Sequence, residues 1–335
     1  MEITAGALME IRINPADVGK RVSVRRVEAG PEGAAHLTDT VGVLVSWTGG
    51  VLLITKKNGD TVRIAESSLV AGKVVPPAPA RRRGPAATFE ELAPVLARAW
   101  QPVESERLGG WTLRAAGGFT RRANSVLPLG DPGIPVAEAL ARVTAWYAER
   151  GLTPYVQAAT GAVGTQEALC AQLAERGWVR EVSADVRIAA LAPVADVAAD
   201  VAQVVLSRGC DEEWLRLYGR TTDPEAALRV LSAGPSVWFA SVPGRAIGRL
   251  VVDGRWAGFA AVEVAPEHRR QGLATAVMAA LARQALAEGA SAAWLQVETD
   301  NTRARALYDG LGFTVHHAYH HYRAPQRADR SAAGS

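Results

Sequence analysis

The chain has 335 residues, a length that predicts two or three domains at ~100–200 residues per domain. Hydrophobic residues make up 48% of it and charged residues 21%, which is typical of a folded protein and excludes an intrinsically disordered one. The formal net charge is +3, and a single proline-rich stretch with Arg81, Arg82 and Arg83 accounts for it. The balanced charge of the remaining chain argues against a nucleic-acid binder held by phosphate contacts.

Targeting and redox signals are weak in this sequence. The two cysteines, Cys170 and Cys210, cannot build a disulfide framework or a four-ligand metal site, so we expect no metal. The start of the chain lacks the basic and then apolar order of a signal peptide, and no apolar run approaches the ~20 residues that span a bilayer. We therefore expect a cytoplasmic protein with reduced thiols and no membrane partner.

The residues before the proline-rich stretch at 75–85 follow a β pattern. Proline removes backbone donors and fixes φ, so we expect a linker at residues 76–87. The expected strands, separated by a Gly49-Gly50 turn and by an Asn58-Gly59 hairpin turn, are residues 21–27, 41–47, 51–57 and 61–65.

Four or five short strands within residues 1–75 predict a small closed barrel. This segment resembles the Src-homology-3-like barrels found as accessory modules. Packing or dimerisation is one role for such a module, and peptide or nucleic-acid binding is another. A homo-oligomer or a protein partner held through this barrel is the partner that the sequence leaves open.

Helices and strands alternate after the linker, and their order recurs. The expected helices are residues 137–150, 166–176, 273–281 and 302–311, and the expected strands are residues 153–158 and 292–298. The run Tyr155-Val156-Gln157 corresponds to Trp294-Leu295-Gln296, and Gly177-Trp178 corresponds to Gly312-Phe313. This recurrence predicts tandem halves at residues 88–188 and 189–325, followed by a disordered tail at residues 326–335.

The most informative stretch, residues 262–274, reads VEVAPEHRRQGLA. A strand ends near Val264, and a basic turn then opens directly onto an amphipathic helix. Helix N-termini offer unpaired N–H groups and a positive dipole end, while small residues such as Gly272 let an anion approach closely. This pattern predicts a phosphate cradle. A tight strand-to-helix turn with a glycine cap is the structural alternative.

Together with Asn301 and the run of residues 307–313, LYDGLGF, this stretch resembles the GNAT superfamily of acetyl-CoA-dependent N-acyltransferases. Residues 269–274 match the pyrophosphate loop of that family, and the later run matches its second motif. The resemblance implies an α/β (α+β) fold with a mixed sheet flanked by helices. The whole arrangement is similar to bacterial GNAT proteins with a small N-terminal barrel and tandem GNAT-like halves.

The resemblance also implies roles for individual residues. The residues that would hold coenzyme A are Val262, Val264, Arg269, Arg270, Gln271, Gly272, Leu273, Ala274, Thr275 and Asn301. Tyr308 would protonate the leaving thiolate, although a helical tyrosine in the core is its plain structural interpretation. The carboxylates nearest the expected reaction centre, Glu263 and Glu298, are candidates for the general base, and strand alternation leaves a solvent-facing role equally open to both.

The first half departs from this family pattern. Residues 129–135 stand where its phosphate loop belongs, yet they are neither basic nor of Gly-x-Ala type. We expect this half to keep the fold without binding coenzyme A. Its expected strand at residues 121–125 either helps to bind the acceptor or is an exposed edge. The acidic residues 211–213 either shape the entrance for the acceptor or are simply solvated.

These observations predict an enzyme that transfers an acetyl group from acetyl-CoA directly to a primary amine through residues 189–325. The acceptor would be a small amine, an amino acid, an antibiotic or a protein amine. The alternative is a non-catalytic acyl-CoA-binding regulatory protein that uses the barrel for partner contacts.

Overall fold

A computed structural model describes residues 10–29, 35–75, 85–220 and 223–325. Its contacts divide the chain into two compact units, residues 1–80 with 159–176 and residues 81–158 with 177–335. Most of the expected linker and the expected tail at 326–335 lie outside the described residues, and the expected domain boundaries stay predictions. No helix in the described ranges is long and apolar enough to cross a membrane.

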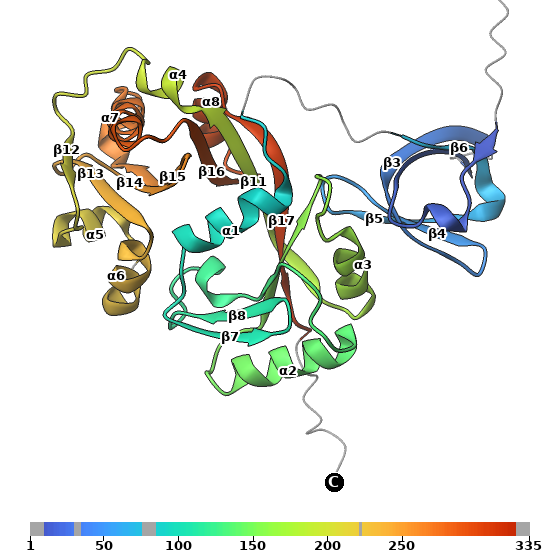
Figure 1. The fold of residues 1–335 in the computed structure, drawn as a ribbon. Coiled ribbons are helices and arrows are strands. Elements are labelled where there is room, and N and C mark those ends of the chain that lie inside the picture. Colours follow the sequence, from blue (N-terminus) through green and yellow to red (C-terminus); the bar gives the residue numbers. More distant parts are fainter. Residues whose placement is uncertain (1–9, 30–34, 76–84, 221–222, 326–335) are drawn as a thin grey trace, which may run out of the picture. The chain divides into compact units, whose positions relative to one another are not determined.

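The first unit contains a six-stranded sheet of order β1-β6-β2-β3-β4-β5, drawn in blue in Figure 1. Its strands are β1 (Ile11–Arg12), β2 (Arg21–Ala29), β3 (Ala35–Thr48), β4 (Val51–Thr55), β5 (Thr61–Ala65) and β6 (Leu69–Val74). Val22, Leu44 and Ile54 lie in its apolar core. The Asn58-Gly59 hairpin is confirmed, because β4 pairs antiparallel with β5 and Gly59 adopts a φ of +86°.

Helix α3 (Glu167–Glu175) belongs to the same unit. The Thr160 hydroxyl, just before this helix, donates a hydrogen bond of 3.0 Å to the carbonyl of Lys57. The helix expected at residues 166–176 is therefore confirmed, and it packs with the six-stranded sheet of its unit.

The second unit contains an eight-stranded mixed sheet of order β10-β17-β11-β16-β15-β14-β13-β12. The strands of that sheet are β10 (Tyr155–Thr160), β11 (Val179–Ala190), β12 (Val205–Ser207), β13 (Ser236–Val242), β14 (Ala246–Asp253), β15 (Trp256–Val264), β16 (Ala292–Glu298) and β17 (Thr314–Arg323). A three-stranded sheet, β7-β8-β9, accompanies it. Its strands are β7 (Glu104–Leu108), β8 (Trp111–Ala115) and β9 (Leu127–Pro128).

Helices cover both faces of the eight-stranded sheet (Figure 1). They are α1 (Phe89–Ala99), α2 (Val136–Ala148), α4 (Leu191–Ala195), α5 (Glu212–Tyr218), α6 (Pro224–Ser232), α7 (Leu273–Ala287) and α8 (Thr302–Gly310). Residues of α4, α7 and α8 share one apolar core with β14, β15 and β16. On the other face, buried Arg249 donates hydrogen bonds to carbonyls at the ends of α1 and α6. The expected mixed sheet flanked by helices is confirmed.

The two long strands β11 and β17 exchange places in the sheet. β11 pairs antiparallel with both β16 and β17, and β17 in turn lies between β11 and β10. The strand that precedes α4 thus completes the sheet of the later residues, while the last strand of the chain reaches the earlier ones. Neither set of strands forms this sheet without the other.

The strand expected at residues 121–125 is wrong. The structure places a 3-10 helix there, η4 (Arg122–Asn124), after a residue with positive φ, Thr120 at 54°. Asn124 is buried, and its side-chain oxygen accepts backbone N–H groups of the preceding turn at 2.8 and 3.1 Å. Its amide nitrogen donates to two carbonyls of that turn at 2.8 Å. These bonds replace a strand ladder, because Asn side chains compete with secondary structure for backbone groups.

Candidate active site

The eight-stranded sheet opens between β15 and β16. These strands pair in parallel only as far as Phe259 and Leu295. Beyond that point β15 stays paired with β14 up to Val264, and β16 stays paired with β11 up to Glu298. The expected end of a strand near Val264 is confirmed, since β15 ends at that residue. The two strand ends therefore border a wedge in the sheet, where another molecule can reach backbone groups.

A bulge in β15 starts this opening. Its register against β14 slips between Ile247 and Arg249, so that Ala261 and Val262 both lie opposite Gly248. Ala261 has a φ of +51°, which is unusual for a residue with a side chain. A bulge leaves one residue out of the ladder and bends the strand. The bend directs β15 away from β16, and it leaves a backbone group next to Val262 outside the hydrogen-bond ladder with β14.

The loop after β15 presents a row of backbone amides at the start of α7. Arg270 and Gly272 both have positive φ, at +63° and +77°. The first amide of this region with a backbone acceptor is that of Ala276, which donates to Gly272 at 2.9 Å. The amides of residues 270–275 have no backbone acceptor within the described part of the chain. Such a row, at the positive end of a helix of fifteen residues, is suited to an anion.

The side chains around this row leave it accessible and make it basic. A Cβ added to Gly272 would meet no atom within 4 Å. Arg269, Arg270 and Gln271 are exposed, while Leu273 is buried in the core and anchors the helix start. The Arg269 Nε donates to the carbonyl of Val264 at 3.3 Å, which ties the loop to the end of β15. The residues present therefore fit a pyrophosphate group.

Tyr308 lies on α8, next to the opening. Its ring packs in the core, with its centroid 6.0 Å from that of Phe313. Burial, and then the charge of Glu263, raise the pKa of Tyr308 to about 12. The phenol is therefore protonated at neutral pH. Tyr308 and Glu263 are carried by α8 and by the end of β15, the strand that borders the opening.

The two candidate carboxylates differ in their surroundings. Val262 and Val264 pack toward the core beneath α7, so the side chain of Glu263 lies on the opposite face. There it accepts a hydrogen bond of 3.1 Å from Arg220. Glu298, at the end of β16, is exposed, and no ion pair or side-chain hydrogen bond reaches it from the described residues. Glu263 thus has a charged partner beside the opening, whereas Glu298 has none among the described residues.

Asn301 caps α8. Its side-chain oxygen accepts the backbone N–H of Ala304 at 3.1 Å, and its own N–H donates to the carbonyl of Glu298 at 3.1 Å. An asparagine at this position satisfies one of the orphan donors of the helix start. The amide nitrogen of the same side chain is left for a ligand.

Sequence reasoning missed the aromatic wall beside Glu263. Tyr218, at the end of α5, stacks with Trp214 at a centroid distance of 5.5 Å and lies 6.2 Å from Phe119. Arg220 lies over the Tyr218 ring at 5.9 Å while it holds Glu263. Burial raises the pKa of Tyr218. No motif marks these residues, although the sequence places them directly after the acidic residues 211–213.

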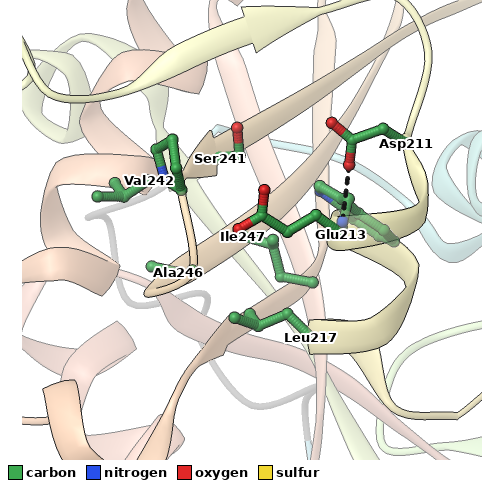
Figure 2. A pocket seen from close by; sticks show the side chains of 10 residues that line it. Asp211, Glu213, Leu217, Ser241, Val242, Ala246 and Ile247 are labelled. Atoms are coloured by element: carbon green, nitrogen blue, oxygen red, sulfur yellow. Dashed lines mark hydrogen bonds between the residues drawn. The ribbon is translucent and has the colours of Figure 1, made fainter.

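Two of those acidic residues, Asp211 and Glu213, border a small pocket between α5 and the β13–β14 turn (Figure 2). Asp211 caps α5 by accepting the backbone N–H of Trp214 at 2.7 Å. Glu213 reaches toward Gly244 of the turn. The pocket also includes Ile247, which pairs with Glu263, so it lies at the same end of the sheet as the opening. Its use as an acceptor entrance stays a prediction.

No group of three or more His, Cys, Asp or Glu residues that could hold a metal occurs among the described residues. The polar groups at the opening are backbone amides, a phenol and two carboxylates. Such groups suit hydrogen bonding and proton transfer.

Comparisons with known proteins agree with this geometry. A family model described as "Probable histone acetyltransferase Rv0428c C-terminal" matches residues 88–322. A protein of Mycobacterium tuberculosis (strain ATCC 25618 / H37Rv), named "Probable histone acetyltransferase Rv0428c", is 31% identical over 307 residues, which cover 90% of this chain and 93% of that protein. A solved GCN5-related N-acetyltransferase from Kribbella flavida superposes with a TM-score of 0.53 at 18% identity, covering 72% of this chain and 97% of the other. That likeness shows a GNAT-like fold.

Proposed function

Because the chain belongs to the family of the Rv0428c C-terminal acetyltransferase domain and is a GNAT-type acyltransferase, we propose that it transfers an acetyl group from acetyl-CoA directly to a primary amine. The observation that carries this proposal is the meeting of three features at one sheet opening. These are the row of unpaired amides at residues 270–275, the protonated phenol of Tyr308 and the carboxylate of Glu263.

The amides of residues 270–275 would bind the pyrophosphate of coenzyme A, with Arg269 and Arg270 adding positive charge. The backbone of β15 near Val262 and Val264 would pair with the pantetheine arm, and the amide of Asn301 would bind the same arm. When bound, acetyl-CoA supplies an activated acyl group. An N–H of the bulge near Val262 would polarise the acyl carbonyl, which is the position where such a donor stabilises developing charge.

Two proton movements complete the reaction. An acceptor amine, with a pKa near ~10.4 in water, must lose a proton before or during attack. Glu263 would accept it, directly or through water. Tyr308 would give a proton to the departing sulfur. No covalent intermediate on the protein is needed, and neither Cys170 nor Cys210 belongs to the opening.

The test is to mix the full chain with acetyl-CoA and a panel of amines, and to follow both free thiol and the acetylated amine by mass spectrometry. Thiol release must exceed the two cysteine thiols of each chain. We expect catalytic release with at least one amine. Binding of coenzyme A without release across the panel would contradict the proposal and favour a non-catalytic acyl-CoA-binding protein.

A protein lysine is a second candidate for the acceptor. The relative that is 31% identical carries the name of a histone acetyltransferase. The exposed acids Glu212 and Glu213 lie on α5, whose end forms the wall beside Glu263, and could attract a basic peptide. Adding a lysine-rich peptide to the amine panel tests this candidate.

We further propose that the six-stranded sheet of the first unit closes into a small Src-homology-3-like barrel that contacts a partner or a second copy. Two partly exposed apolar side chains, Val27 and Leu37, lie opposite each other on β2 and β3. Sedimentation of the full chain over a range of concentrations tests this role, with Leu37→Glu as the variant expected to weaken association. The relation of residues 88–188 to 189–325 as tandem halves is also a proposal, supported by the reciprocal exchange of β11 and β17.

A further inference from the structure

A cluster of basic side chains lies on the sheet face opposite α7. His321, on β17, is buried, and neither ring nitrogen has a hydrogen-bond partner among the described residues. Its ring lies 5.5 Å from that of Tyr319 and 6.3 Å from that of Tyr155. Burial, followed by the charges of Arg114, Arg121 and Arg122, lowers the pKa of His321 well below its ordinary value. A neutral imidazole keeps one N–H donor for a ligand.

The arginines around His321 are short of carboxylates. Arg114 is buried and donates only to neutral groups, the Ser125 carbonyl and hydroxyl and the Gln157 side-chain oxygen, at 2.8 to 2.9 Å. Arg122 lies over the Trp100 ring at 4.9 Å, and its buried Nε has no partner within the described ranges. Burying cations and polar atoms in this way costs free energy of folding unless an anion pairs with the charge or a hydrogen-bond partner satisfies the polar atom.

One carboxylate, Glu181, lies at the edge of this cluster, and three other groups already share it. Arg121 approaches it at 3.7 Å, the Tyr155 hydroxyl donates to it at 2.8 Å, and Arg323 forms a short ion pair with it. Glu181 therefore leaves the charges of Arg114 and Arg122 uncompensated. Since Arg121 and Arg122 are only partly buried, the cluster is open to solvent on their side.

This cluster continues into the catalytic opening. The Tyr319 hydroxyl lies 3.4 Å from the side-chain oxygen of Gln296, which follows the last β16 residue paired with β15. A row of aromatic rings connects the two ends. The Trp100 ring under Arg122 lies 6.3 Å from that of Phe119, which lies 6.2 Å from that of Tyr218. Arg220 lies over the Tyr218 ring and donates to Glu263. A molecule that lies along this row can therefore reach Glu263 at one end and Arg122 at the other.

We propose that Arg122, Arg114 and His321 form a subsite for an anionic group of the acceptor, so that the enzyme acetylates amines that also carry a carboxylate or a phosphate. This inference rests on the proposed acetyl transfer to an amine. The amine of such an acceptor lies at Glu263, and its anionic oxygens accept hydrogen bonds from the arginines and from the His321 ring N–H. A lysine-rich peptide, by contrast, would bring further positive charge against uncompensated arginines.

Matched acceptors test the subsite. 5-Aminopentanoate and n-pentylamine share the same amine and number of carbons and differ in the carboxylate, and 4-aminobutylphosphonate replaces the carboxylate with a phosphonate. We expect kcat/KM for 5-aminopentanoate or the phosphonate to exceed that for n-pentylamine by about 10- to 100-fold, as expected for hydrogen bonds to a charged group. In Arg122→Gln this preference should disappear. Arg142→Gln, which removes an exposed arginine paired with Glu138 on α2, should keep it.

A binding readout separates this inference from the proposed chemistry. In the full chain with coenzyme A present, NMR of the histidine ring signals reports contact at His321, which His321→Phe identifies. If no amine is acetylated, the proposed function fails, yet a shift of the His321 signal by 5-aminopentanoate or the phosphonate, absent in Arg122→Gln, still supports the subsite. Equal rates for the matched acceptors together with an unmoved His321 signal would overturn it. A shift caused by coenzyme A alone would also overturn it, by assigning the cluster to the co-substrate.

Discussion

The loop before α7 and the loop before α2 follow corresponding strands, yet they differ in charge and in packing. β15 pairs in parallel with β16, and Val126 just before β9 forms a parallel bridge with Val156 of β10. In residues 129–135, however, an acidic residue bonds to the backbone of the loop and of its neighbour. The Asp131 carboxylate accepts the Gly133 N–H at 2.6 Å, and its carbonyl accepts the N–H of Gly110 at 2.6 Å. A carboxylate in this loop disfavours an anion.

Close packing holds the loop before α2 in place. A Cβ added to Gly109 would lie 2.4 Å from the Pro132 carbonyl, whereas one added to Gly272 would meet nothing within 4 Å. The carbonyl of Pro135 also accepts the first amides of α2, those of Glu138 and Ala139. The same strand–loop–helix layout therefore carries a close-packed, acidic loop in one region and an open, basic loop in the other.

Two buried tyrosines show the same contrast. The pKa of Tyr147 on α2 and that of Tyr308 on α8 are both raised to about 12, in each case chiefly by burial. The Tyr147 hydroxyl donates to the Arg114 carbonyl at 2.8 Å and accepts its N–H at 3.2 Å. The Tyr308 hydroxyl has no hydrogen-bond partner among the residues that the structure describes. One phenol is fixed by the backbone and the other is available for chemistry.

The largest expected effect comes from closing the open loop. Gly272→Glu places bulk and negative charge among the amides of residues 270–275 and forces a side chain onto a φ of +77°. We expect the affinity for coenzyme A to fall by at least about 100-fold, since charge repulsion replaces a charge-assisted hydrogen-bond network. Isothermal titration measures it.

Gly133→Glu is the matched control in the other loop. Gly133 also has a positive φ, at +76°, and open space around its Cβ position. We expect this variant to bind coenzyme A as the parent does, with a similar cost in stability. Equal losses of affinity in the two variants would remove the distinction between the loops.

Glu263→Gln should have the next largest effect, on kcat. Loss of a general base typically costs about 100-fold or more, and Gln keeps the shape of the side chain beside Arg220. Glu298→Gln, at the exposed end of β16, should leave kcat within about twofold because no ion pair or side-chain hydrogen bond from the described residues reaches it. Steady-state thiol release measures both variants. A larger loss in Glu298→Gln would transfer the role of base to that residue.

Tyr308→Phe should lower kcat by about 100-fold, the low end of general-acid contributions, while the affinity for coenzyme A stays unchanged. Tyr147→Phe is its control. It should cost about 1 kcal/mol of stability through two lost hydrogen bonds and leave kcat at the parental value. Denaturant unfolding and thiol-release kinetics separate the two effects. If both variants kept full turnover, Tyr308 would be a packing residue only.

The elements of this fold follow from local patterns. The helix expected at 302–311 and the strand expected at 292–298 occur within a residue of their predicted ends, because apolar spacing and flanking glycines act locally. The prediction of a strand at 121–125 is wrong because the side-chain bonds of Asn124 to the preceding turn decide the shape of this segment. Local alternation of polar and apolar residues cannot show such bonds.

One part of the candidate site can also be predicted from local sequence, and the other part cannot. The loop at 269–274 can be read from adjacent residues, since a helix start needs only local geometry to present amides. Tyr218, Arg122 and His321 lie about a hundred residues apart or more in sequence, on α5, η4 and β17, and meet only because β17 crosses to the earlier strands. The exchange of β11 and β17 has no sequence signal. The sequence could therefore name residues 121–125 and 211–213 as candidates for the acceptor, but not the contacts of Tyr218 and His321.

The smallest expected effect concerns stability at alkaline pH, and here the two tyrosines should behave alike. The folded-state pKa of each phenol, about 12, lies above its ordinary value of 10.0. Each therefore contributes stability that is fully present below pH 10 and is lost as the pH rises toward 12. At pH 11 each phenol should account for about 1 kcal/mol of the lost stability, so Tyr308→Phe and Tyr147→Phe should both flatten the fall of unfolding free energy between pH 9 and 11. Denaturant titrations at these pH values measure it. A flattening in Tyr147→Phe alone would mean that Tyr308 ionises in the ordinary range and is open to water rather than enclosed beside Glu263.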